Sequence, residues 1–198
     1  MIQHCTKCPL PPLFSSELCW EHLPNAERAE WLKAALQDAY YYGDMSMNLS
    51  GVDFGGASFR SAHMDGLILR EANLDGCDLS GVVVMKGDMN GASLRGANLQ
   101  NIKLCECQLN DCDFTNANLN SANLEGSDLL RSRFIGADLS RAHLFGADCT
   151  DADFTSANLA DANLRSSTLV NCELSNACTD RTDLTDVTYE RITEENEE

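Results

Sequence analysis

Residues 117–129 read ANLNSANLEGSDL, so a small residue, an Asn or Asp, and a Leu return every five positions. Neither regular secondary structure has this period. Five residues advance an α-helix by roughly 500°, so the Leu side chains would drift about 140° per repeat. On a straight strand an odd spacing sends successive Leu side chains to opposite faces. The Leu residues can share one interior only if the chain turns a corner within every repeat.

The repeat continues in one register from Leu49 to Tyr189, with no insertion. Of the 29 central positions, Thr179 alone is clearly polar, and a mostly small residue stands two positions before each. A short fixed period, in which no unit can bury its own apolar face, is typical of a solenoid.

The units ANLDG, ANLQN, ADLSR and ANLAD resemble the A(D/N)LXX motif of the pentapeptide repeat proteins. The resemblance implies an all-β solenoid, a right-handed quadrilateral parallel β-helix with four pentapeptides per coil and about seven coils. At roughly 4.8 Å per coil the rod is about 35 Å long. Residues 20 apart then stack, and one interior column places the rings of Phe114, Phe134 and Phe154 on one another.

The other repeat positions have structural explanations. Asn and Asp side chains are expected to bond to neighbouring backbone groups at the bends, and the glycines to occupy turns. No two cysteines in the repeats lie 20 positions apart, so stacked disulfides are not expected. Cysteines at the small inward position should pack as small apolar residues; they are Cys77, Cys107, Cys112 and Cys172.

Residues 1–24 contain two pairs of metal-binding residues, Cys5-x2-Cys8 and Cys19-x2-His22, separated by ten residues. Two such pairs suit tetrahedral Zn²⁺, and a site with all four positions filled is structural. His4 is a sterically poorer fourth ligand than His22 because it adjoins Cys5. The alternative is three reduced thiols and a surface His. The sequence favours a zinc-binding knuckle.

Three further segments follow. Residues 25–43 predict a helix with Asn25 as N-cap and Gly43 at its C-terminal end, and this helix is expected to cover the first coil. Residues 44–191 form the β-helix, and residues 192–198 are an acidic tail. No apolar run approaches the length of a membrane span or a signal peptide, so we expect a cytoplasmic protein.

The net charge is −17, which argues against nucleic acid as a direct partner. Assigned to faces by their position in a 20-residue coil, the acidic residues favour the face that contains Leu49. Apolar residues at outward positions, including Val170, suggest a partner surface. The predicted partner-binding residues are Asp88, Asp111, Asp128, Asp148, Asp151, Leu130, Ile135 and Phe145.

Two functions fit these features. We favour a non-enzymatic scaffold that presents an acidic, partly apolar surface to a protein partner. The alternative, which the resemblance implies, is a DNA mimic that binds a type II topoisomerase (DNA gyrase or topoisomerase IV) and protects it from fluoroquinolones. Duplex DNA carries a charge every ~1.7 Å, about 20 over this length, and the repeats fall well short of that. No P-loop, nucleophile elbow or triad indicates an enzyme.

The C-terminal coil has no predicted cap comparable to the N-terminal helix. An open coil end leaves backbone groups unpaired, and family members that this chain resembles often pair through that end. We therefore expect a homodimer through the C-terminal end.

Elemental analysis of the purified protein should find about one zinc per chain, because two paired ligand sets complete a tetrahedral site. The double substitution Cys5→Ser with Cys8→Ser should abolish it. Cys178→Ser, in the repeats, is the matched control and should retain the metal. Metal-free wild-type protein would refute the site.

Overall fold

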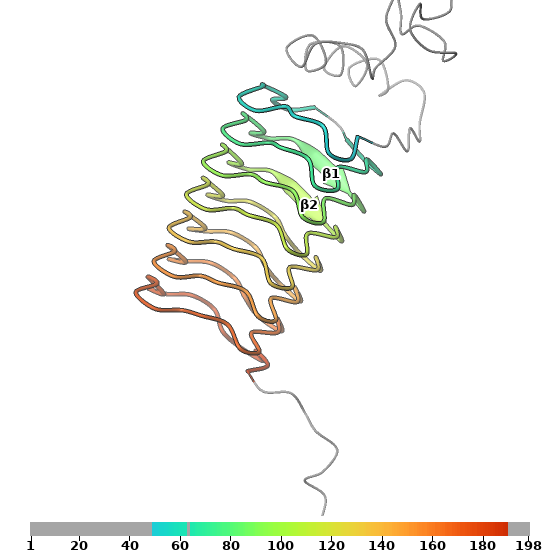
Figure 1. Cartoon of the computed structure of the whole chain (residues 1–198). Helices are drawn as coiled ribbons and strands as arrows, with labels where there is room; N and C mark the ends of the chain where they lie inside the picture. Colours follow the sequence, from blue (N-terminus) through green and yellow to red (C-terminus); the bar gives the residue numbers. More distant parts are fainter. Residues whose placement is uncertain (1–48, 63, 190–198) are drawn as a thin grey trace, which may run out of the picture.

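The computed structural model describes residues 49–62 and 64–189, which form one stack of similar coils (Figure 1). Two strands are long enough to be named, β1 (Val83–Met85) and β2 (Lys103–Cys105). They pair in parallel, with Val83 opposite Lys103. Elsewhere, neighbouring coils are paired through isolated parallel β-bridges, each between residues 20 positions apart. With a turn every five residues, each circuit has four sides, so the predicted solenoid and the stacking at 20 residues are confirmed.

The right-handed winding and the count of about seven coils stay predictions. The zinc knuckle of residues 1–24, the helix of residues 25–43 and the tail of residues 192–198 lie outside the described residues.

Every backbone N–H of a typical repeat has a partner, as the repeat centred on Phe114 shows. Asp113 donates to the preceding coil, while Phe114 and Asn116 donate to the following one, over 2.7–3.0 Å. Ala117 closes the turn by donating to the carbonyl of Phe114 at 2.9 Å. The remaining N–H, that of Thr115, donates to the Asp113 carboxylate at 2.9 Å. The Asn or Asp of the motif therefore completes the hydrogen bonding of its own turn.

The third residue of each turn has a positive φ from Gly51 to Asp186. A positive φ at the third residue, together with the hydrogen bond from the fourth residue to the first, is typical of a type II turn. Type II turns favour Gly or Asn at the third position. Ten glycines occupy it, as expected, but so do eighteen other residues, including Arg131 with φ of 57°. The turn is thus imposed by the stacking of coils, since most L side chains disfavour it.

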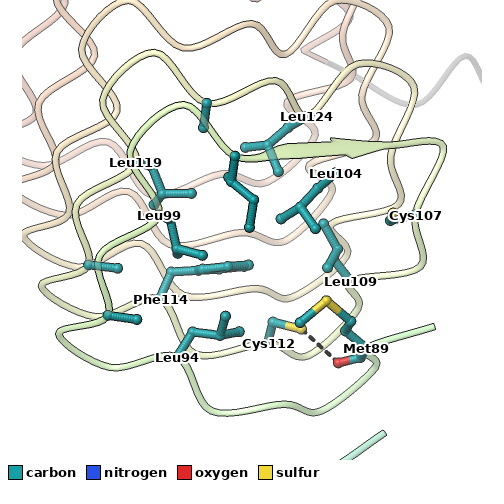
Figure 2. Packing of buried hydrophobic residues seen from close by; sticks show 14 of the residues in the cluster. Met89, Leu94, Leu99, Leu104, Cys107, Leu109, Cys112, Phe114, Leu119 and Leu124 are labelled. Atoms are coloured by element: carbon teal, nitrogen blue, oxygen red, sulfur yellow. Dashed lines mark hydrogen bonds between the residues drawn. The ribbon is translucent and has the colours of Figure 1, made fainter. Parts of the chain in front are cut away.

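Central side chains and the small residues two positions before them fill the interior. Phe114, Phe134 and Phe154 stack with ring centroids 4.8 and 4.9 Å apart and planes within 3° of parallel, which confirms the predicted column. The thiol of Cys112 is buried and donates to the carbonyl of Met89 at 3.0 Å (Figure 2). In the described residues no buried side-chain polar atom lacks a partner.

The turns that follow β1 and β2 depart from the pattern. Neither Gly87 nor Cys107 closes its turn with a backbone bond. Cys107 donates instead to the Ser127 hydroxyl at 3.0 Å, and that hydroxyl donates to the carbonyl of Leu104. A Cβ on Gly87 would stand 2.5 Å from the Val84 side chain, so glycine is needed there for space. These open turns were not predicted from the sequence.

Candidate interaction surface

Most acidic residues of the motif serve the fold. Each Asn or Asp that precedes a central residue accepts a hydrogen bond from the N–H two positions later, with Asp128 as the single exception in the described ranges. These bonds measure 2.9–3.3 Å and link, for example, Asp138 to Ser140 and Asp148 to Thr150. Their carboxylates are consequently fixed close to the backbone.

Arginine side chains neutralise further carboxylates across neighbouring coils. Arg131 binds Asp111 through two bonds of 2.7 Å, and Arg70 pairs with Asp88 at 2.5 Å. The Arg131 guanidinium lowers the pKa of the exposed Asp111 carboxyl. Two of the five acids predicted to bind a partner, Asp88 and Asp111, are therefore already paired.

Asp128 is the exception because another residue accepts the hydrogen bond from the N–H two positions after it. The N–H of Leu130, which Asp128 would be expected to bind, donates to the Asn110 side chain at 2.9 Å from the preceding coil. Asp128 is exposed, and its side chain has no hydrogen bond or ion pair with any described residue. Its carboxylate is free to meet a partner.

The other two predicted acids are hydrogen-bonded by neutral groups. Asp148 stacks directly after Asp128 and accepts hydrogen bonds from the N–H and hydroxyl of Thr150 at 3.0 and 2.6 Å. Asp151 accepts a bond of 3.0 Å from Asn171. Neither carboxylate has an ion pair within the described residues, although Arg131 lies close enough to Asp151 to interact with it.

The predicted apolar residues do not form a single cluster. Leu130 is half-buried and Val170 is buried, with Thr150 between them in one corner column. Phe145 lies at the next corner of the coil and remains 41% exposed. Ile135 is half-buried at a third corner, one repeat after Leu130 and off the side that contains Asp128 and Asp148.

One side of the rod nevertheless combines most of these residues. Asp128 and Asp148 occupy its middle, with Phe145 at one corner and the Leu130–Thr150–Val170 column at the other. Glu125, one coil before Phe145, is exposed at the same corner. We call this surface the acidic face; its residues are Glu125, Asp128, Leu130, Phe145, Asp148, Thr150 and Val170.

Other chemistry is sparse among the described residues. No group of three or more His, Cys, Asp or Glu side chains in residues 49–62 and 64–189 is arranged to hold a metal ion.

The buried cysteines are not reactive. Burial raises the pKa of the Cys112 thiol to about 12 and that of Cys77 to about 11, so both stay protonated. Cys77, Cys107 and Cys112 are buried as predicted, whereas Cys172 is half-buried in the last circuit. Over the same ranges, no helix is long and apolar enough to cross a membrane. The predicted zinc ligands Cys5, Cys8, Cys19 and His22 lie outside the described residues.

The fold and its capping residues define a class of protein, a solenoid built from five-residue turns with an Asn or Asp in each. The family model for pentapeptide repeats matches residues 48–83, 86–111, 107–146 and 147–186, in eight copies. The chain belongs to the pentapeptide repeat family. No match was found among curated proteins.

Solved structures with the same architecture are distant in sequence. Full-length QnrB1, a plasmid-mediated fluoroquinolone resistance protein, is 16% identical over 75% of this chain and 93% of its own, with a TM-score of 0.43. HetL, from the cyanobacterium Nostoc sp. strain PCC 7120 and involved in heterocyst differentiation regulation, is 22% identical over 77% of this chain and 94% of its own, with a TM-score of 0.25. These likenesses carry no functional argument.

Equilibrium unfolding can test whether Asn110, and not Asp128, caps the turn at Leu130. Asp128→Ala should change the free energy of unfolding by less than about 0.5 kcal/mol, since its carboxylate bonds to nothing in the fold. Asp138→Ala is the matched control and should cost about 1 kcal/mol, because it leaves the Ser140 N–H without its partner.

Combining Asn110→Ala with Asp128→Ala should cost more than the two single substitutions together, since either side chain can reach the Leu130 N–H. Equal losses for Asp128→Ala and Asp138→Ala would contradict the assignment.

Proposed function

We propose that this protein is a non-enzymatic scaffold that presents the acidic face to a protein partner. The observation that carries the proposal is Asp128, an exposed carboxylate at a capping position that the fold does not use for capping. The exposed ring of Phe145 on the next coil adds apolar area next to this charge. An apolar residue surrounded by charge is a common composition for a partner surface.

The absence of an enzymatic function is part of this proposal. Function in a filled solenoid has to be carried by outward side chains, and the outward acids of the described residues mostly cap turns or pair with arginine. His143 is exposed on a different side. We expect the scaffold to act in the cytoplasm and to carry a structural zinc at Cys5, Cys8, Cys19 and His22.

The alternative function is a DNA mimic that occupies a type II topoisomerase and protects it from fluoroquinolones. Acidic residues on neighbouring coils, such as Asp128 and Asp148, whose backbones are about 4.8 Å apart, favour it. The pairing of Asp88 and Asp111 with arginine weighs against it, because it removes charge from the same side of the rod. DNA mimicry needs a dense array of uncompensated charge.

A supercoiling assay separates the two functions. We expect no inhibition of DNA gyrase and no relief of fluoroquinolone-induced cleavage at a large molar excess of the protein, even at low salt where charge attraction is strongest. Inhibition that weakens as salt rises would instead support the mimic and contradict the scaffold proposal.

We further propose a homodimer through the C-terminal end. Several backbone N–H groups of the last circuit have no acceptor among the described residues; they include those of Leu174, Asn176, Thr179, Arg181, Leu184, Asp186 and Tyr189. Leu184 and Tyr189 are 39% and 52% exposed, whereas Leu49 and Phe54 in the first circuit are 1% and 2% exposed.

Within the described residues, the first circuit is buried and the last circuit is partly exposed, so the proposal gives each chain a single end for pairing. Pairing of two open ends about a twofold axis closes the assembly, and a filament would need both ends free. This asymmetry supports a dimer as the final state.

Light scattering at micromolar concentration should give a mass near twice the 21.7 kDa of the chain. Leu184→Lys should lower that mass towards the monomer, because it puts two like charges at the open end. Leu130→Lys, half-buried on the acidic face, is the control and should leave the dimer intact. A wild-type monomer at all salt concentrations would exclude the dimer.

A further inference from the structure

We propose that the acidic face docks a basic amphipathic helix of a partner protein, lying along the axis of the rod. This inference rests on the proposed scaffold function and adds the chemistry and geometry of the partner. The face is an unpartnered side of a parallel β-ladder with charge in its middle and apolar groups at both corners.

The charge of the acidic face lacks its own counterions. Glu125, Asp128 and Asp148 form no ion pair within residues 49–62 and 64–189. The two arginines nearest to them are directed elsewhere, Arg131 to Asp111 at 2.7 Å and Arg165 to Asp186 at 3.6 Å.

Asp128 and Asp148 are neighbours in the ladder, so two like charges face each other without a cation between them. Lysine or arginine from a partner would relieve this repulsion.

The apolar groups set the edges of the docking surface. Among residues 49–62 and 64–189, three large apolar residues are exposed, and Phe145 is the one outside the last circuit, which contains Leu184 and Tyr189. At the opposite corner, Leu130 adds a half-buried side chain to the column of Thr150 and Val170. A partner that covers both corners would bury apolar area on each side of the lysine or arginine side chains that face Asp128 and Asp148.

The spacing of the carboxylates favours a helix over an extended segment. Successive coils are about 4.8 Å apart, and helix residues at i and i+3 or i+4 have Cβ atoms about 5–6 Å apart. Same-face residues of a strand are roughly 6.6 Å apart, a poorer match to neighbouring rungs. One side of the coil contains about three extended residues, or roughly 10 Å, which is close to the diameter of an α-helix.

The test uses the full-length protein and a labelled 14-residue helical peptide of leucine and lysine, with lysines on one face. Binding is measured by fluorescence anisotropy at physiological salt, and a peptide with glutamate in place of lysine is the control for charge. We expect saturable binding of the lysine peptide and none of the glutamate peptide.

Two substitutions then locate the site. Asp128→Asn should weaken binding about threefold, the effect of one exposed ion pair, and Phe145→Ser about tenfold, the effect of removing an aromatic contact residue. Asp180→Asn, an equal charge change at an exposed position on another corner, should alter affinity less than twofold. Circular dichroism spectra that match the wild type would show that each variant is folded.

Equal weakening by Asp128→Asn and Asp180→Asn would mean unspecific charge attraction and would overturn the docking site, as would the absence of binding. Failure of the docking site is distinguishable from failure of the scaffold function. If a partner identified by crosslinking in the native host still binds the Asp128→Asn, Phe145→Ser double variant with unchanged affinity, the scaffold stands and the helix-docking surface is wrong.

Discussion

The hydrogen bond from a turn N–H to the Asn or Asp side chain two residues earlier is the interaction on which this solenoid depends. Three of the five N–H groups in a repeat bond to neighbouring coils and a fourth closes the turn. The fifth N–H has no backbone acceptor, and leaving such a donor unpaired costs about 1–3 kcal/mol where it is buried. In the repeats that have an Asn or Asp before the central residue, the side-chain acceptor removes that cost, so the chain turns there without an unsatisfied backbone group.

Because the turns need a side-chain acceptor, a high content of Asp does not by itself predict a binding surface. An Asp at the capping position is selected by the turn, so its presence does not by itself indicate binding. Asp138, for example, accepts hydrogen bonds from both Ser140 and Asn158 at Oδ1 and so serves the fold. A carboxylate that the turn does not use, such as Asp128, is a more specific indication of function than the total charge of the rod.

Much of the architecture was predictable because the five-residue register has no insertion, and one period fixes both the stacking and the interior. The phenylalanine column follows directly from residues that stand 20 positions apart. The distribution of the candidate surface was less predictable. Val170 has an outward position in the repeat but is buried, since corner side chains stack on one another as well. Asn110 caps a turn in the next coil, and a rule that considers only residues of the same turn cannot find it.

The open turns after β1 and β2 were missed for a similar reason. They depend on Cys107 and Ser127, which act through hydrogen bonds between coils, and both have the ordinary small-residue identity of their position. A sequence signal exists only in Gly87, which replaces the usual Ala or Cys where the Val84 side chain approaches.

Residue-resolved amide hydrogen exchange tests the hydrogen-bonding account most directly. The account predicts slow exchange at all five positions of the interior repeats whose turn amide is capped by a side chain, including the amides of Thr115 and Thr155. If Thr115 and Thr155 exchange as fast as an unstructured peptide while Phe114 and Phe154 remain protected, the side-chain cap does not hold the turn and the account is wrong.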